Sequence, residues 1–304
     1  MKSPLLVVGS VALDSVITPF GKATEVLGGS ATYFSTAASF FTKVRLVGVI
    51  GFDFPKRHMA FLRGQGIDVR GLQKMPGHTF RWTGRYEYDF NEAHTIETQL
   101  NVFESFRPRI PEEYRDTPFV FLANIDPDLQ LEVLQQVRRP RLVACDTMNY
   151  WIERKPMALL RVMKKVHMVI VNETEAREVS RETNLVRAAR KILSFGPRIV
   201  IVKRGEYGAL MVLNGSTFFA PAFPLETVVD PTGAGDSFAG GLMGYLARCG
   251  HVDDTHLRRA IVYGSALASF NVEDFSLGRL KTLKFPEINK RFREFKSLTH
   301  FHPV

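Results

Sequence analysis

The chain has 304 residues, of which 45% are hydrophobic and 23% are charged. This composition is typical of a folded globular protein and excludes disordered, collagen-like and coiled-coil chains. The formal net charge is +9, but lysine and arginine are spread along the chain, so we expect neither a nucleic-acid nor a membrane partner. Two cysteines cannot form a disulfide framework and no apolar run is long enough to cross a membrane, so a cytoplasmic location is expected.

Short apolar and β-branched runs alternate with helical patterns along the chain. The runs that predict strands span residues 5–9, 44–49, 119–123, 142–146, 168–172, 199–203, 209–213 and 227–230. The expected helices span 31–41, 55–65, 129–137, 176–180, 186–195, 236–248, 253–270 and 286–295. The alternation predicts an α/β fold with a doubly wound, mostly parallel central sheet flanked by helices. Ligands of such folds bind beyond the carboxyl ends of the strands.

Residues 79–106 depart from this alternation because they are polar and aromatic, with a strand-like alternation over 81–90. They predict a small β-excursion, which is either a surface hairpin without function or a lid that closes the site against water. No linker rich in proline, glycine or serine divides the chain. We therefore expect a single domain over 1–304, with a β lid formed by about 12–27 and 79–106.

The strongest motif is the string VVDPTGAGDSFAGG at residues 228–241. A strand end, a glycine turn and an apolar helix would present the backbone N–H groups of Gly233, Ala234 and Gly235 at a helix N-terminus, which favours an anion. Asp236 would lie inside this cradle as an ionised general base. A glycine turn with a capping aspartate is the alternative. The length and consistent chemistry of the string favour transfer of a phosphoryl group to an alcohol.

This string resembles the C-terminal signature of the ribokinase-like, phosphofructokinase-B carbohydrate kinase family. The resemblance implies that Asp14, after the first strand, binds hydroxyl groups of the acceptor. It also implies that the pair Gly28 and Gly29 lets the acceptor approach the backbone. The family often has asparagine where this chain has Tyr33, so ribokinase's sugar contacts do not carry over directly. The remaining acceptor-site candidates are two strand-end residues, Asn124 and Asp146.

The resemblance further implies ATP as the phosphoryl donor and Mg²⁺ as its counterion. In the family, the Asn-x-x-Glu motif organises magnesium and the phosphates, with the glutamate acting on the metal indirectly. Lys203 stands where the family often has threonine, and is either a cation near the phosphates or an ordinary strand-end lysine. A monovalent cation, commonly K⁺, is implied near Asp230. The expected nucleotide-site residues are Asn172, Glu175, Lys203, Gly205, Gly208, Thr232 and Asn271.

We therefore expect an ATP-dependent kinase that phosphorylates a hydroxymethyl group of a small sugar. A nucleoside kinase is the alternative, since aromatic side chains such as Tyr33, Trp82 and Tyr86 could stack on a base. A non-catalytic sugar or nucleotide binder is a third possibility, against which the intact Asp236 argues. The resemblance also leaves room for a homodimer formed through the lid.

Overall fold

The computed structural model describes residues 3–90 and 93–300. Its centre is a nine-stranded sheet with the strand order β13-β12-β11-β10-β9-β8-β1-β4-β5. Every neighbouring pair from β5 to β11 is parallel, and β12 and β13 are antiparallel additions, which confirms the predicted mostly parallel sheet. The strands are β1 (Leu5–Val8), β4 (Val44–Gly51), β5 (Asp68–Met75), β8 (Phe119–Leu122), β9 (Leu142–Cys145), β10 (Met168–Asn172), β11 (Ile199–Lys203), β12 (Ala209–Leu213) and β13 (Ser216–Ala220).

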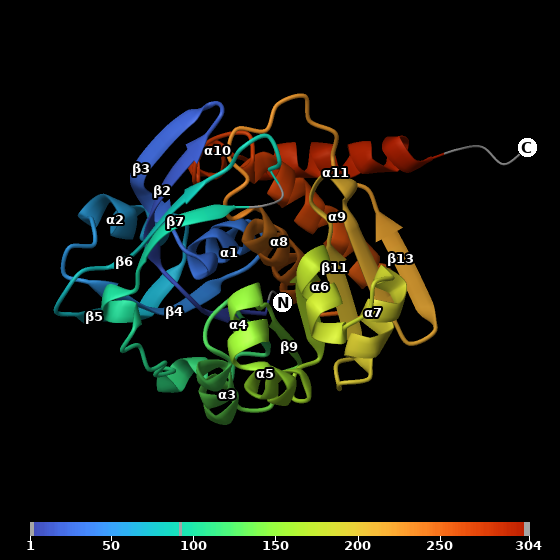
Figure 1. Cartoon of the computed structure of the whole chain (residues 1–304), viewed down its shortest axis with the longest axis horizontal. Helices are drawn as coiled ribbons and strands as arrows, with labels where there is room; N and C mark the ends of the chain where they lie inside the picture. Colours follow the sequence, from blue (N-terminus) through green and yellow to red (C-terminus); the bar gives the residue numbers. More distant parts are fainter. Residues whose placement is uncertain (1–2, 91–92, 301–304) are drawn as a thin grey trace, which may run out of the picture.

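Helices cover both faces of this sheet (Figure 1). Alternate residues of β1 serve two separate cores: Leu5 and Val7 pack in one, Leu6 and Val8 in the other. The first core is closed by α1 (Ser30–Ser39), α2 (Lys56–Gly64), α8 (Ala234–Cys249), α9 (Asp254–Asn271), α10 (Gly278–Thr282) and α11 (Phe285–Thr299). The second is closed by α3 (Pro127–Gln136), α4 (Asn149–Arg154), α5 (Pro156–Met163), α6 (Glu173–Ser180), α7 (Leu185–Leu193) and the short turns η1 (Asn101–Phe103) and η2 (Glu112–Tyr114).

A second sheet of four strands stands at one side of the main sheet, at the upper left of Figure 1. We call it the small sheet. Its strands, in spatial order, are β3 (Gly21–Gly28), β2 (Ala12–Thr18), β6 (Phe80–Arg85) and β7 (His94–Gln99). β2 and β6 are parallel, and their register places Asp14 opposite Trp82. Because side chains alternate along a strand, these two share one face and Leu13, Ser15 and Arg81 share the other.

The strand predicted at residues 227–230 is wrong. This segment is irregular and its backbone is held by a helix end instead: the N–H groups of Val229 and Asp230 donate to the Val272 carbonyl at 2.8 and 3.4 Å. Prolines on either side, Pro224 and Pro231, remove ladder donors from the region. The last strand of the main sheet is β13. In the described ranges, no helix has the length and apolarity that crossing a bilayer requires.

Candidate active site

The glycine turn before α8 adopts a conformation that only glycine takes readily. Gly233 has φ 74°, in the left-handed region, and is the residue that precedes the helix. The Ala234 N–H closes the turn onto the Pro231 carbonyl at 3.1 Å, and no side chain caps the helix start. Unpaired amides and the helix dipole make this end of α8 attractive to an anion.

Asp236 lies in the first turn of α8, as the sequence predicts. Desolvation and, after it, the nearby Asp146 carboxylate raise its pKa to about 7, against the opposing charge of Lys203. The expectation that the cradle keeps Asp236 fully ionised at neutral pH therefore needs correction, because loss of water outweighs the cationic neighbour. A carboxyl group with a pKa near the working pH is well suited to accept a proton.

Three neighbouring strands, β9, β10 and β11, end beside the start of α8 and bring charged side chains there. The Lys203 ammonium donates to the Asp146 carboxylate, with 2.9 Å between Nζ and Oδ2. The other Asp146 oxygen, Oδ1, accepts from the Thr147 N–H at 2.8 Å. A Cβ placed on Gly235 would lie 3.0 Å from Lys203 Nζ, so this ammonium touches the first turn of α8.

Glu175 belongs to the same charged cluster and also stabilises the start of α6. Its Oε2 accepts from the Asn172 N–H at 2.8 Å, and the Asn172 side chain accepts from the Glu175 N–H at 2.8 Å. This reciprocal pair is a capping box that starts α6. Burial raises the pKa of Glu175 to about 8, with Asp146 adding to the rise and Lys203 opposing it.

Asp14 enters the site from the small sheet. Its Oδ2 accepts from the Gly29 N–H at 3.3 Å, and a Cβ on Gly28 would lie 1.9 Å from the same oxygen. Gly28 is therefore required for Asp14 to reach this position, whereas Gly29 is required by its positive φ and by the Ser10 carbonyl oxygen, which would lie 2.6 Å from its Cβ. Burial raises the pKa of Asp14 to about 7, and the charges of Asp230 and Asp236 push in the same direction. Asp14 of the small sheet, Asp230 before the glycine turn and Asp236 of α8 are thus close enough to act on one another electrostatically.

Two tyrosines line this space between the sheets. The Tyr33 ring lies against Gly233, and its buried hydroxyl makes no hydrogen bond of 3.5 Å or less in the described part of the chain, although Ser276 is near enough to act on its pKa. Burial raises the pKa of Tyr33 well above its usual value. Tyr86, just after β6, places its hydroxyl 3.5 Å from Thr232 Oγ1. The sequence marks Tyr86 only as an aromatic ring, and nothing local in it indicates contact with the turn before α8.

Several predicted site residues turn out to be engaged by the protein itself. The Asn271 side chain is fully buried, donating to the Thr232 carbonyl at 2.8 Å and accepting from the Ser237 hydroxyl at 3.0 Å. It braces the glycine turn from behind, and its place in the nucleotide site stays a prediction. Asn124 accepts from the Trp151 indole N–H at 3.1 Å, and no contact joins it to Asp14 or Asp236 among the described residues.

Gly205 and Gly208 flank the turn η3 (Gly205–Tyr207) that joins β11 to β12. Both have positive φ, and a Cβ on Gly208 would lie 2.0 Å from the Ala220 carbonyl oxygen. The turn follows directly on Lys203, which places it on the outer side of the charged cluster. Asp230 is fully buried and accepts from the N–H groups of Thr232 and Ser276, each at 2.9 Å.

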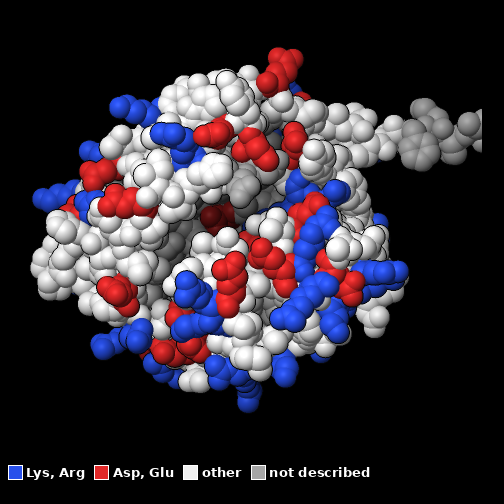
Figure 2. Space-filling model, in the orientation of Figure 1, with Lys and Arg blue, Asp and Glu red and all other residues white. Residues whose placement is uncertain are grey.

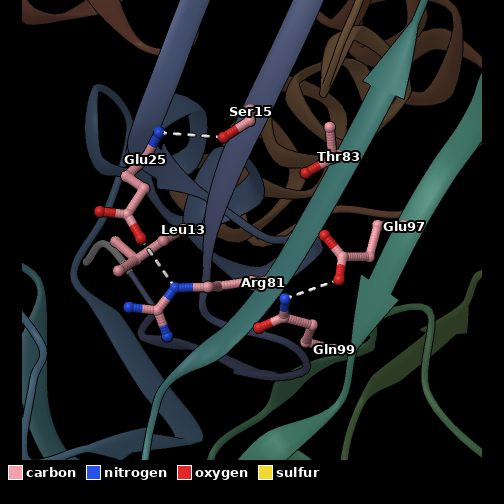
Figure 3. A pocket seen from close by; sticks show the side chains of 7 residues that line it. All are labelled: Leu13, Ser15, Glu25, Arg81, Thr83, Glu97 and Gln99. Carbon is pink, nitrogen blue, oxygen red and sulfur yellow. Dashed lines mark hydrogen bonds and ion pairs between the residues drawn. The ribbon is translucent and has the colours of Figure 1, made fainter.

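Figure 2 shows a hollow in the middle of the molecule's face, with acidic atoms at its floor. A second pocket, with a volume of about 180 Å³, opens elsewhere and is drawn in Figure 3. Leu13, Ser15, Arg81 and Thr83 line it, so it lies on the face of the small sheet opposite to Asp14. This pocket is therefore distinct from the space between the two sheets.

A comparison with protein families matches residues 13–282 to the pfkB family carbohydrate kinases. The chain belongs to this family. It is therefore a phosphotransferase, and the motifs predicted from the sequence all lie within or beside the matched region.

One relative and two solved structures show which individual proteins this chain resembles. The chain is 35% identical, over 250 residues, to the cytidine kinase of Thermococcus kodakarensis, covering 80% of this chain and 88% of that one. The nucleoside kinase of Burkholderia thailandensis, solved with inosine, superposes with a TM-score of 0.77 at 20% identity, covering 98% and 99% of the two chains. A ribokinase II of E. coli, solved with ATP and Mg²⁺, gives a TM-score of 0.79 at 20% identity and covers 96% and 99%. At such identities the two structures establish the fold alone.

Proposed function

We propose that this protein transfers the γ-phosphoryl group of ATP to the primary hydroxyl of a nucleoside. The observation that carries the acceptor class is the similarity to a cytidine kinase over most of both chains. The small sugar that the sequence favours becomes the second candidate. In its favour, the Trp82 ring covers Gly84 and its indole N–H donates to Thr95 at 3.2 Å, so this ring is engaged in packing the small sheet.

The proposed reaction is a direct in-line transfer. Asp14 accepts hydrogen bonds from hydroxyl groups of the acceptor and orients it. The attacking oxygen forms a bond to the γ-phosphorus as the bond to the bridging oxygen of ADP breaks, and its proton passes to Asp236. The amides at the start of α8 stabilise the charge that develops on the transferring group.

Magnesium ions bind phosphates together with one or two carboxylates. The residues present fit such an ion, because Glu175 is a buried carboxyl group in the same cluster as Asp236, whereas both oxygens of Asp146 are already taken by Lys203 and the Thr147 N–H. Glu175 would act on the metal from the edge of the site, since one of its oxygens is used by the capping box. When bound, Mg²⁺ supplies charge neutralisation for the phosphates of ATP.

Asp230 fits the proposed monovalent cation. Its carboxylate is fully buried, and no ion pair involves it within residues 3–90 and 93–300. Two backbone N–H groups satisfy part of its charge. A buried carboxylate without a full counter-charge is a favourable site for a cation. K⁺ at this position would steady the turn before α8 and the loop at 271–278 together.

The small sheet is proposed as a lid over the acceptor. The contact between Tyr86 and Thr232 supports this role, because it joins the end of β6 to the turn that begins α8. Closure would exclude water from the transferring group. Dimer formation through this sheet stays a prediction.

The test is a direct assay of the purified protein with ATP and Mg²⁺ against cytidine, other nucleosides, ribose and fructose. We expect release of ADP that depends on a nucleoside, with the phosphate on its primary hydroxyl as located by ³¹P NMR. Turnover with a sugar alone would establish the second candidate. Turnover with neither class would refute the kinase proposal.

A further inference from the structure

Lys203 is a largely buried cation beside the start of α8, where the proposed reaction places the transferring phosphoryl group. It ends β11, and its side chain is only 18% exposed. Its Nζ is 2.9 Å from Asp146 Oδ2 and lies against Gly235, one residue before the proposed base. The sequence leaves two roles open for it, a phosphate contact or an ordinary strand-end lysine. An ordinary strand-end lysine would extend into solvent, whereas this one turns inward.

Asp146, the partner of Lys203, is buried and both of its carboxylate oxygens accept hydrogen bonds. One Asp146 oxygen takes the lysine and the other takes the Thr147 N–H, and only 5% of the Asp146 side chain is exposed. Gln130, on α3, donates to the carbonyls of Asp146 and Ala123, both at 3.0 Å, which ties the ends of β8 and β9 together. Asp146 is thus a fixed carboxylate, and the flexible member of the pair is the lysine.

Several carboxyl groups around the Lys203–Asp146 pair compete for the ammonium of Lys203. Asp146, Glu175 and Asp236 all act on Lys203 electrostatically, so a single ammonium serves three carboxyl groups. A triphosphate entering at the start of α8 would bring a higher density of negative charge to the same ammonium. A lysine is suited to exchange of this kind, because its head group is a point charge with three donors on a flexible stem.

We propose that Lys203 exchanges partners during the reaction: Asp146 holds it in the empty site, and the γ-phosphoryl group of ATP takes it over when the nucleotide binds. Lys203 is then a catalytic residue that contacts the transferring group. Asp146 is a positioning residue that stores the lysine and does not bind the acceptor, in contrast to the sequence-based expectation. This inference rests on the proposed function only in taking ATP as the donor.

Nucleotide binding without an acceptor tests the exchange. Dissociation constants for ADP and for the non-transferable analogue β,γ-imido-ATP are measured with Mg²⁺ by titration calorimetry. The set comprises the wild type, Lys203→Met, Asp146→Asn and the double variant. Lys155→Met serves as the matched control, because Lys155 also bridges two carboxylates, at 2.7 Å from both Asp126 and Asp128, but outside the site.

We expect Lys203→Met to weaken the ATP analogue about 10–100-fold, the worth of one charge-assisted hydrogen bond, with ADP nearly unchanged. Its kcat should fall by about 10²-fold. Asp146→Asn should tighten binding of the ATP analogue, because a competitor for the lysine is removed. Lys155→Met should leave both nucleotides at wild-type affinity.

Two results would overturn the exchange. Equal weakening of ADP and the ATP analogue in Lys203→Met would mean that the lysine does not reach the γ-phosphoryl group. Weaker binding of the ATP analogue in Asp146→Asn would mean that the pair is one fixed unit. If Lys203→Met folds poorly, the charge-balanced double variant carries the same comparison of ADP with the ATP analogue. Failure of the acceptor assay would leave these binding results unaffected, so the two proposals fail separately.

Discussion

The Tyr33 ring lies so close to Gly233 that a Cβ at position 233 would be 2.3 Å from its nearest atoms. Tyr33 comes from α1 and Gly233 directly precedes α8, so this contact limits how closely the two helices approach at this point. The positive φ of Gly233 adds a second demand for glycine at the same position.

Substituting Gly233 by alanine should therefore cost both stability and activity. We expect a loss of about 1–3 kcal/mol in the free energy of unfolding, from strain and steric conflict. The rate should fall with it, because the turn that precedes Asp236 is displaced. Chemical denaturation and steady-state kinetics measure the two effects. Gly215, with a similar φ of 80° and open space around its Cβ position, is the control for strain alone, through Gly215→Ala.

Tyr33→Phe should separate binding from folding. The buried Tyr33 hydroxyl makes no hydrogen bond of 3.5 Å or less in the described structure and only a weak interaction with Ser276, so its removal should change the stability of the protein little. If this hydroxyl binds the acceptor, the KM for the acceptor should rise while the KM for ATP stays constant. Unchanged values of both constants would show that the hydroxyl does not take part in recognition.

Asp236→Asn should abolish most turnover while ATP binding persists. Loss of a general base lowers rates by about 10²–10⁴-fold. The amides of the first turn remain in place in this variant, which is why nucleotide affinity should survive. A variant that keeps more than about a tenth of the wild-type rate would contradict the assignment of Asp236 as base.

The pH dependence of stability follows from two carboxyl groups. The pKa values of Asp14 and Asp236 are raised from 3.8 to about 7 in the folded chain. Between these values the native state binds more protons than the unfolded state, so stability falls as pH rises through this window. Asp236→Asn should therefore raise the melting temperature most at pH 8, by less at pH 5, and little below pH 3.8. The opposite order would mean that the carboxylate stabilises the empty site.

The same pKa affects catalysis. Asp236 must be deprotonated to accept a proton, so kcat should rise with pH through about 7 and then level off. A rate that is flat from pH 5.5 to 8.5 would contradict this, provided that ATP and acceptor are saturating at every pH.

Residues 233–236 could be predicted from the sequence because the chemistry of that turn is local: a short string determines the backbone shape, the helix start and the carboxylate. The Asn172–Glu175 pair is local in the same way. The Lys203–Asp146 pair joins strands β11 and β9, which are separated by a third strand, and no spacing in the sequence indicates it. The partners of the buried Asn271 amide, Thr232 and Ser237, are likewise distant in the sequence, and no spacing indicates them.

The sheet was predictable from its apolar runs, but its last strand was not. Residues 227–230 have a strand-like sequence pattern, but their backbone is hydrogen-bonded to the end of α9. Tertiary contacts determine this pairing, so the local pattern does not predict it. β5 escaped prediction because it is a largely polar edge strand with a single fully buried position, Gly71.

Asp14 is part of β2, and β2 is hydrogen-bonded to β6 and β3 as one rigid piece that runs into α1 through Gly28 and Gly29. Any swing of the small sheet away from α8 must carry the Asp14 carboxylate with it. An open enzyme that holds ATP alone would then lack the group that orients a nucleophile, and a stray water molecule would meet an unassembled site. If the small sheet opens as proposed, the architecture itself would guard ATP against futile hydrolysis.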